Sequence, residues 1–193
     1  MSKNENFIVK LIGLPTMLEK QTDLNETLSR CVQITANLLN VKNCSIMLIE
    51  KKGKGELFLR VFASFGRLPI LAFYRSVRVG EGIAGYVAST GKTLMVEDIG
   101  QSEFLSAARR PESQDKSFIS TPILINDNIV GVFNVSSPID ERIFTQQDLE
   151  IVNIMRLLIA KSIHVIQLQN ILLPIYAKAI KGQPRLQNSG ETL

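Results

Sequence analysis

The sequence has little of what most catalytic sites are built from. Its 193 residues include one histidine and two cysteines. The histidine, His164, has no Cys, His or carboxylate cluster near it, so a partly exposed helical residue is favoured over a catalytic or metal-ligating one. No serine stands in a G-x-S-x-G turn. We therefore expect no catalytic residue, no metal site and no cofactor, and we expect that the chain is not an enzyme.

Long apolar runs are also absent. None approaches the roughly 20 residues that span a membrane, and residues 1–6 lack the pattern of a secretory signal. Cys31 falls in a predicted helix and Cys44 in a predicted strand, which indicates a reduced compartment rather than a disulfide framework. We expect a cytoplasmic protein without a membrane partner.

The net charge of +4 and the pI of about 9.1 raise the question of nucleic acid. A nucleic-acid footprint would gather basic residues on one element, interleaved with aromatic ones. Here the basic residues are scattered over a turn, a strand end and a loop, and a solvated surface is the favoured interpretation. We expect no nucleic-acid partner. The residues are Lys51, Lys52, Lys54, Arg75, Arg78, Arg109 and Arg110.

Helical patterns occupy the N-terminal part of the chain. Residues 5–21 predict a first helix, bent or divided at Pro15 because proline removes a backbone donor. A second helix begins where Asp23 can cap and Glu26 can complete a capping box, and Asn40 is a plausible stop.

The C-terminal part predicts one long helix. Thr145 caps it, Asp148 takes the third position of the capping box, and apolar residues continue to about Leu173, where Pro174 ends or kinks the helix. At 1.5 Å per residue it would be about 40 Å long, which exceeds the expected diameter of the domain. We therefore predict a homodimer through residues 153–173. The predicted interface residues are Met155, Leu158, Ser162, Val165 and Leu172.

Between these helices the sequence predicts six strands, joined mostly by short turns. They cover residues 44–50, 56–64, 76–79, 93–97, 117–125 and 129–136. Short turns imply a mainly antiparallel sheet, and the helices before, within and after it can cover both faces, which defines an α+β sandwich. The polar stretch 98–116 is a long loop, and such loops are usually functional or disordered.

A glycine-rich stretch, Gly80–Lys92, permits two interpretations. Its first six residues match the G-x-G-x-x-G turn of dinucleotide-binding proteins. That turn requires a buried strand before it and a full crossover after it, whereas here the preceding strand is half polar and the next follows after about 12 residues. The favoured alternative is a short helix entered and left through glycines, with Gly85 allowing close approach to the sheet.

Three segments in this order resemble the GAF family of small-molecule sensor domains: residues 22–28, the run 80–98, and 122–135 with 144–148 beyond it. The resemblance implies a six-stranded antiparallel sheet with helices on both faces. It also implies a ligand cavity between the sheet and the middle helix and loop, and signalling through the terminal helices. It divides the chain into an N-terminal helix (1–21), a GAF-like domain (22–168), and a helix extension with a disordered tail (169–193).

The sequence departs from several branches of that family. Cyclic-nucleotide-binding members carry Asn-Lys where this chain has Ser137-Pro138, and Asp-Glu where it has Asp148-Leu149. Members that reduce methionine sulfoxide use cysteines in the loops between the middle strands, and this chain has none after Cys44. Haem-bearing relatives are disfavoured because His164 lies deep in the last helix.

Strand alternation singles out a candidate ligand site. It places Asn134 and Ser136 on one face of their strand, and Ser120 on one face of the strand before it. With Asp98, which begins the long loop, these residues are the predicted ligand-binding set. The alternative for each is ordinary bonding to the backbone or exposure to solvent.

Two functions of different class remain open. In the first, the chain is a regulatory sensor that binds an unidentified small ligand between the sheet and the 98–116 loop and signals through its terminal helices. In the second, it is a ligand-free dimerisation module whose helices dock a regulatory protein. A redox enzyme related to methionine sulfoxide reductase is a distant third.

Overall fold

The computed structural model describes residues 23–66, 76–98 and 117–181, with side chains described as far as Pro174. The described helices and strands follow one another in the order that the sequence predicts, with ends that differ by a few residues. The elements are α2 (Leu24–Leu39), β1 (Val41–Lys52), β2 (Glu56–Phe65), β3 (Ser76–Arg78), α4 (Gly82–Thr90), β4 (Leu94–Val96), β5 (Phe118–Ile125), β6 (Asn128–Pro138) and α6 (Gln146–Lys181).

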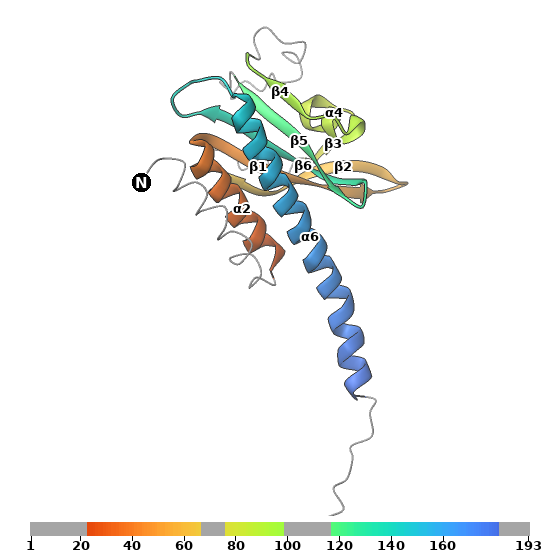
Figure 1. Ribbon diagram of the computed structural model, residues 1–193. Coiled ribbons are helices and arrows are strands. Elements are labelled where there is room, and N and C mark those ends of the chain that lie inside the picture. Colours follow the sequence, from red (N-terminus) through yellow and green to blue (C-terminus); the bar gives the residue numbers. More distant parts are fainter. Residues whose placement is uncertain (1–22, 67–75, 99–116, 182–193) are drawn as a thin grey trace, which may run out of the picture.

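The six strands form one sheet in the order β3-β2-β1-β6-β5-β4, and every neighbouring pair is antiparallel. Helices α2 and α6 lie side by side over one face, and α4 lies over the other (Figure 1). The predicted α+β sandwich with a six-stranded antiparallel sheet is confirmed.

Two apolar clusters hold these layers together. The larger joins α2 and α6 to the sheet and contains Phe133 and Val135 of β6. The smaller joins α4 to the sheet and contains Val132 of the same strand. Alternate residues of β6 therefore enter different clusters, as the period of two along a strand requires.

The predicted cap at Asp23 and the predicted stop at Asn40 are confirmed. The Asp23 carboxylate accepts a hydrogen bond from the Glu26 amide at 2.9 Å, and Asn40 ends the helix in the left-handed conformation. The β5–β6 hairpin turns on Asn126 and Asp127, which both have positive φ, as a two-residue type I′ turn demands.

The glycine-rich stretch is a structural turn and helix. Gly80 and Gly82 have positive φ, and Gly91 ends α4 in the left-handed conformation. Gly85 lies so close to β3 that a Cβ atom there would be 2.5 Å from the Arg78 carbonyl oxygen. The strands before and after α4 lie at opposite edges of the sheet. They do not form the adjacent parallel pair of a dinucleotide-binding unit, so that interpretation is excluded.

The α6 helix is longer than predicted. It spans 36 residues and continues through Pro174 to Lys181, so the expectation that proline could end it there is wrong. Proline removes one backbone hydrogen bond, and the carbonyl that loses its partner belongs to Asn170, an exposed residue that water can reach. The helix is about 54 Å long at 1.5 Å per residue, and it projects well beyond the sheet (Figure 1).

Several predictions concern residues outside those that the structure describes. They are the N-terminal helix over 1–21, the irregular patch at 67–75, nearly all of the 98–116 loop, and the tail from 182. Among the described helices, none combines the length and hydrophobicity that crossing a membrane requires.

The position of Gly85 generates the first prediction. Replacing glycine by alanine inside a helix normally stabilises it, but Gly85→Ala places a methyl group against the Arg78 carbonyl. We expect this variant to lower the free energy of unfolding by about 1–3 kcal/mol, as overpacking does. Urea unfolding measures it, with Ser89→Ala on the exposed side of the same helix as the control. A Gly85→Ala protein as stable as wild type would contradict the close packing.

Candidate functional site

A row of polar side chains crosses the sheet on the face that α4 covers. The register pairs Ser64 of β2 with Ser45 of β1, Ser45 with Asn134 of β6, and Asn134 with Ser120 of β5. We call these four residues the polar row. It lies two residues along the strands from Met47 and Val132, where the α4 cluster ends.

Hydrogen bonds connect three members of the polar row. The Ser120 hydroxyl donates to the Asn134 side-chain oxygen at 2.7 Å, and the Asn134 side-chain nitrogen donates to the Ser45 hydroxyl at 3.4 Å. Ser120 is buried, whereas Asn134 and Ser45 are partly exposed. Because a primary amide has two N–H donors and an oxygen with two lone pairs, Asn134 retains one donor and one acceptor position beyond these bonds.

The other two predicted ligand residues lie farther along. Ser136 is on the same face of β6 as Asn134 and pairs with Phe118 in the next layer. Asp98 is exposed, two residues beyond Val96, which also pairs with Phe118. The structure thus brings Ser120 and Asn134 into contact and places Ser136 one layer away. Asp98 stands past the end of β4.

Sequence reasoning missed Ser45 and Ser64. Both follow the same alternation as Asn134, but nothing in the sequence indicates which residues of β1 and β2 lie beside it. A bulge adds a further complication, since the β1–β2 register shifts between Ile46 and Met47. Only the register between strands shows that the two serines extend the row.

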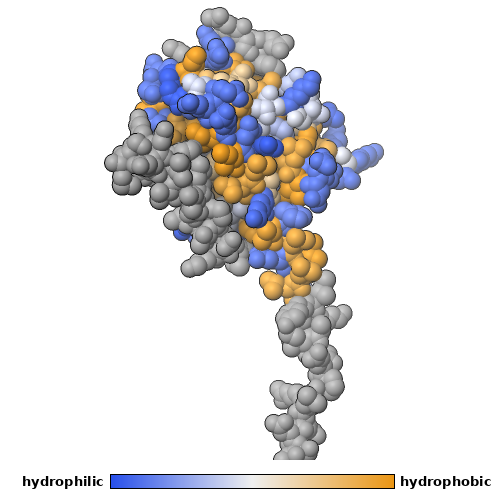
Figure 2. All heavy atoms as spheres, viewed as in Figure 1, coloured by the Kyte–Doolittle hydropathy of each residue, from blue (hydrophilic) through white to orange (hydrophobic). Residues whose placement is uncertain are grey.

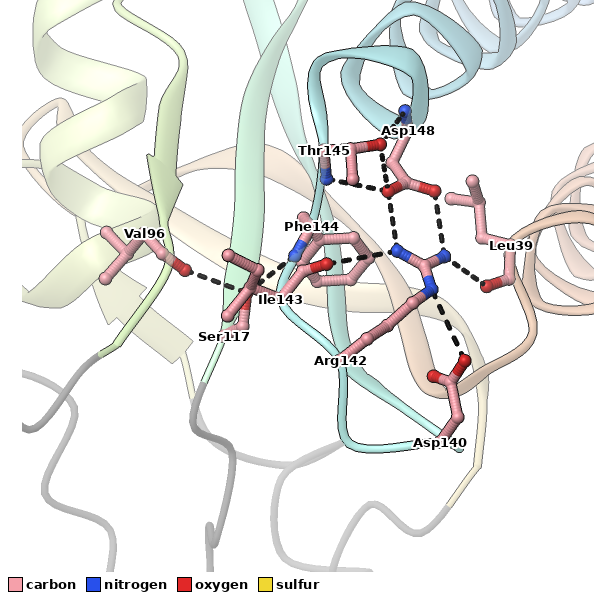
Figure 3. A network of polar contacts seen from close by, with 9 residues as sticks. All are labelled: Leu39, Val96, Ser117, Asp140, Arg142, Ile143, Phe144, Thr145 and Asp148. Atoms are coloured by element: carbon pink, nitrogen blue, oxygen red, sulfur yellow. Dashed lines mark hydrogen bonds and ion pairs between the residues drawn. The ribbon is translucent and has the colours of Figure 1, made fainter.

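A second polar cluster surrounds the start of α6 (Figure 3). Arg142 donates two hydrogen bonds to the Asp148 carboxylate, at 2.6 and 2.9 Å, and a third to the Leu39 carbonyl at the end of α2, at 3.3 Å. Asp148 also accepts from the backbone and side chain of Thr145, and the Thr145 hydroxyl accepts from the Asp148 amide. The predicted capping box is therefore confirmed. The arginine that joins it was not predicted, because an Arg in a preceding loop is no specific signal.

The ionisation of Asp148 follows from these contacts. Burial by itself would raise the pKa of its carboxyl group, but the hydrogen bonds from Arg142 and Thr145 and the positive charge of Arg142 outweigh burial, and the pKa is lowered. The hydrogen bond to Asp148 in turn raises the pKa of Arg142. The pair is ionised at neutral pH and ties α2 to α6.

Ser117 connects this cluster to the sheet. Its hydroxyl donates to the Val96 carbonyl at 3.0 Å and accepts from the Phe144 amide at 3.3 Å (Figure 3). Phe144 immediately precedes the capping box and is buried in the larger cluster. The end of β4, the start of β5 and the start of α6 are thus joined through one side chain.

The predicted dimer residues of α6 lie on different sides of the helix. Met155 is fully buried in the larger cluster, so including it in an exposed interface was wrong. Leu158 and Ser162 are half-buried, and the Ser162 hydroxyl bonds to the Leu158 carbonyl of its own helix. Val165 and Leu172 are exposed. Of the five predicted residues, Val165 and Leu172 are thus exposed as an interface requires, whereas Met155 is not.

Both cysteines are buried in the larger cluster, on the side of the sheet away from the polar row. Burial raises the pKa of the Cys31 thiol to about 12, and burial together with the charge of Cys31 raises that of Cys44. Within the described residues, no group of three or more His, Cys, Asp or Glu could hold a metal ion.

The comparisons with known proteins agree with the fold. The family model described as "GAF domain" matches residues 21–164, and the chain therefore belongs to the GAF domain family. It is 26% identical over 132 residues to a Nif-specific regulatory protein of Herbaspirillum seropedicae, covering 66% of this chain and 24% of that protein. It is 25% identical over 150 residues to the cone cGMP-specific 3',5'-cyclic phosphodiesterase subunit alpha' of Bos taurus, covering 72% and 17%. The chain thus spans a quarter or less of these relatives.

Solved structures show the same architecture. The GAF domain of a phosphoenolpyruvate-protein phosphotransferase from Coxiella burnetii superposes with a TM-score of 0.72 at 18% identity, covering 88% of this chain and 99% of that one. Free methionine-R-sulfoxide reductase from Neisseria meningitidis superposes with a TM-score of 0.70 at 16% identity, covering 86% and 93%. At identities below 20%, these similarities establish the fold and not the function. Regulatory proteins and an enzyme both use it.

The lowered pKa of Asp148 generates the second prediction. A carboxyl group whose pKa is lower in the folded state stabilises the fold above its unfolded pKa of about 3.9, and this stabilisation is lost as pH falls through the folded value. We expect Asp148→Asn to cost about 1.5–3 kcal/mol of unfolding free energy at pH 7, as losing charged hydrogen bonds does. The difference from wild type should shrink towards pH 2. Urea unfolding at several pH values measures it.

The control for this experiment is Asp127→Asn in the exposed β5–β6 turn, where asparagine also tolerates a positive φ. Its difference from wild type should be small throughout the pH range. An Asp148→Asn deficit of equal size at pH 7 and pH 2 would show that the charge of Asp148 contributes nothing.

Proposed function

We propose that this chain is a regulatory sensor domain that binds a small ligand at the polar row and signals through its terminal helices. The observation that supports this most is the state of Asn134. Its amide keeps one donor and one acceptor position, it is partly exposed, and its orientation is held by Ser120 and Ser45. A few oriented polar groups beside an apolar surface are typical of small-molecule sites. Ser136 and Asp98 are proposed as further contacts.

A physical route from the polar row to α6 supports the signalling part. Ser120 lies three residues after Ser117 on β5, and Ser117 bonds to the backbone immediately before the α6 capping box. A shift at the start of β5 therefore changes a hydrogen bond at the start of α6. Arg142 extends the connection to the end of α2. Both described helices on that face thus meet the sheet at one place.

We further propose that different parts of the chain carry sensing and output. The division into a terminal helix (1–21), a sensor domain (22–168) and an extension (169–193) assigns sensing to the middle part and output to the ends. A homodimer formed through residues 153–173 carries the output to a regulatory protein partner. The setting that we propose is the cytoplasm.

One observation favours a second candidate, a ligand-free interaction module. Ser120, Asn134 and Ser45 bond to one another, and such a chain of hydrogen bonds can satisfy a sheet face without a ligand. In that case the exposed apolar surface of α6 is the functional feature, and the polar row only maintains the sheet.

The cysteines support a non-enzymatic role. Reduction of a sulfoxide by a cysteine needs a thiolate that the substrate can reach. Cys31 and Cys44 are inaccessible, their pKa values are raised, and they face α2 and α6 rather than the polar row.

The burial of both thiols generates the third prediction. In the native chain, a thiol reagent such as dithionitrobenzoate should label neither cysteine at pH 8 within minutes. After denaturation it should label two per chain. Absorbance of the released product measures the labelling. Rapid native labelling of either thiol would reopen the redox hypothesis, and loss of a measured sulfoxide reduction in Cys44→Ser would establish it.

The fourth prediction concerns the ligand. Native mass spectrometry of freshly purified protein should show a retained small molecule. Asn134→Leu should lose it, because the substitution removes the free donor and acceptor at similar volume. Ser89→Ala, on the exposed side of α4, should retain it, and a thermal melt of each variant checks folding.

Three outcomes discriminate the two candidates. A molecule lost only in Asn134→Leu supports the sensor. A molecule retained by a folded Asn134→Leu protein contradicts the polar row as its site. Wild-type protein without any bound molecule, purified from several growth conditions, favours the interaction module.

A further inference from the structure

The side-chain amide of Asn134 is held between two shorter side chains. Ser120 stands on one neighbouring strand and Ser45 on the other, each directly opposite Asn134 in the register. The Ser120 hydroxyl donates to the amide oxygen at 2.7 Å, and the amide nitrogen donates to the Ser45 hydroxyl at 3.4 Å. A serine hydroxyl lies one bond closer to the backbone than the amide atoms of asparagine do. Because side chains stand roughly perpendicular to a sheet, both serines therefore approach the amide from its flanks.

The edge of the amide that points away from the sheet is left free by this arrangement. One N–H donor and one oxygen lone pair lie side by side on it, in the plane of the amide. The pattern is the same whichever way the amide is turned, because turning it exchanges the roles of the two serines and again leaves one donor beside one acceptor. Asn134 is partly exposed, as contact with a ligand requires.

The described side chains around this edge carry no charge. Three layers of paired residues cross β1, β6 and β5 on this face of the sheet, with the polar row in the middle. The layers are Asn43, Ser136 and Phe118, then Ser45, Asn134 and Ser120, then Met47, Val132 and Pro122. An anion would meet no positive partner among these residues, and desolvating a charge without such a partner is costly.

We propose that the polar row selects an uncharged ligand with an amide edge, meaning an N–H donor and a carbonyl acceptor side by side in one plane, as in a primary carboxamide or a lactam. This rests on the sensor function proposed above and names the class of its ligand. The ligand N–H donates to the Asn134 oxygen, and the ligand carbonyl accepts from the Asn134 nitrogen. Two such bonds in one plane are how an asparagine side chain recognises a matching edge.

Other planar groups do not match this edge. A carboxylate offers acceptors only, so one of its oxygens would face the Asn134 oxygen. The negative charge of Asp98, which we propose as a further contact, would also repel it. An amidinium offers donors only, so one of its N–H groups would face the Asn134 N–H. Each mismatch leaves polar groups unpaired, and unpaired groups discriminate strongly between ligands.

The polar row offers further donors towards β2. Ser45 accepts from Asn134 and keeps its own O–H, and in the described part of the chain neither Ser45 nor Ser64 donates its hydroxyl proton to another group. The two serines are paired on adjacent strands, which lie about 4.8 Å apart. A ligand whose amide edge meets Asn134 can therefore place a second acceptor over Ser45 or Ser64.

The fifth prediction uses four probes that share one ring: benzamide, which has an amide edge, N,N-dimethylbenzamide and benzoate, which have acceptors only, and benzamidine, which is a cation with donors only. Titration into the nitrogen-15-labelled full chain, followed through the backbone amide signals of residues 132–136, measures each Kd. Benzamide should bind at least about 10-fold more tightly than each of the others, because every mismatch leaves a polar group unsatisfied.

Asn134→Asp is the deciding variant. Its carboxylate is similar in size to the amide, accepts from both flanking serine hydroxyls, and presents only acceptors to a ligand. The preference should reverse, so that benzamidine binds at least about 10-fold more tightly than benzamide. A purely structural role of Asn134 would change the affinities of all probes alike. Ser89→Ala, on the exposed side of α4, should keep the wild-type order, and thermal melts confirm that both variants are folded.

Three results overturn the inference: equal affinities for benzamide and N,N-dimethylbenzamide, tighter binding of benzoate than of benzamide, or no saturable binding of benzamide at about 20 mM, where even weak affinities are measurable. An unreversed preference in a folded Asn134→Asp protein also overturns it. If that variant does not fold, the order of the probes in wild type decides alone.

These results are distinct from a failure of the sensor proposal. A molecule that is retained by wild type and lost in Asn134→Leu supports the sensor. If the structure of that molecule has no amide edge, only the ligand class is wrong. If no molecule is retained and no probe binds, both proposals are wrong.

Discussion

The pairing of β1 with β6 at the centre of the sheet is the constraint on which the rest depends. Side chains alternate between faces along each strand, so one register decides every neighbour at once. With Ser45 beside Asn134, the apolar residues Ile46 and Phe133 face α2 and α6. A slip by one residue would bury the polar row in the larger core and expose the residues that support both helices.

The same register explains why a polar row is tolerated in an otherwise apolar layer. A buried hydroxyl or amide is costly unless it is hydrogen-bonded, and pairing across strands brings Ser120 and Asn134 to 2.7 Å. The row lies where the α4 cluster ends, because α4 has only nine residues and cannot cover the full length of the strands. Among the described elements, α4 therefore covers only the part of this face that lies beside Met47 and Val132.

The start of α6 combines stability with connection. Asp148 belongs to the capping box, which is a local contact within the first turn of α6. Its other partner, Arg142, also donates a hydrogen bond to the Leu39 carbonyl at the end of α2. Ser117 adds the sheet to the same junction. Because these bonds share atoms, a change in one alters the geometry available to the others. The end of α2, the sheet and the start of α6 are therefore joined at one place.

Local patterns by themselves determined much of this protein. The caps at Asp23 and Thr145, the β5–β6 turn and the structural role of Gly80, Gly85 and Gly91 depend on neighbouring residues or on backbone freedom, which the sequence displays. The alternation along β6 also follows from the sequence, and so the faces of Asn134 and Ser136 were predictable. The fold class follows from these elements and their order.

Only the tertiary structure decided which of these residues meet. Ser45 joined Asn134 through a register that no local pattern encodes, and Arg142 reached Leu39 across 103 positions of the chain. Met155 and Ile154 are both apolar and adjacent in the sequence, yet one is fully buried and the other exposed. The physical reason is that hydrophobicity indicates that a side chain favours burial, whereas the packing of α6 on the sheet determines which side of the helix is buried.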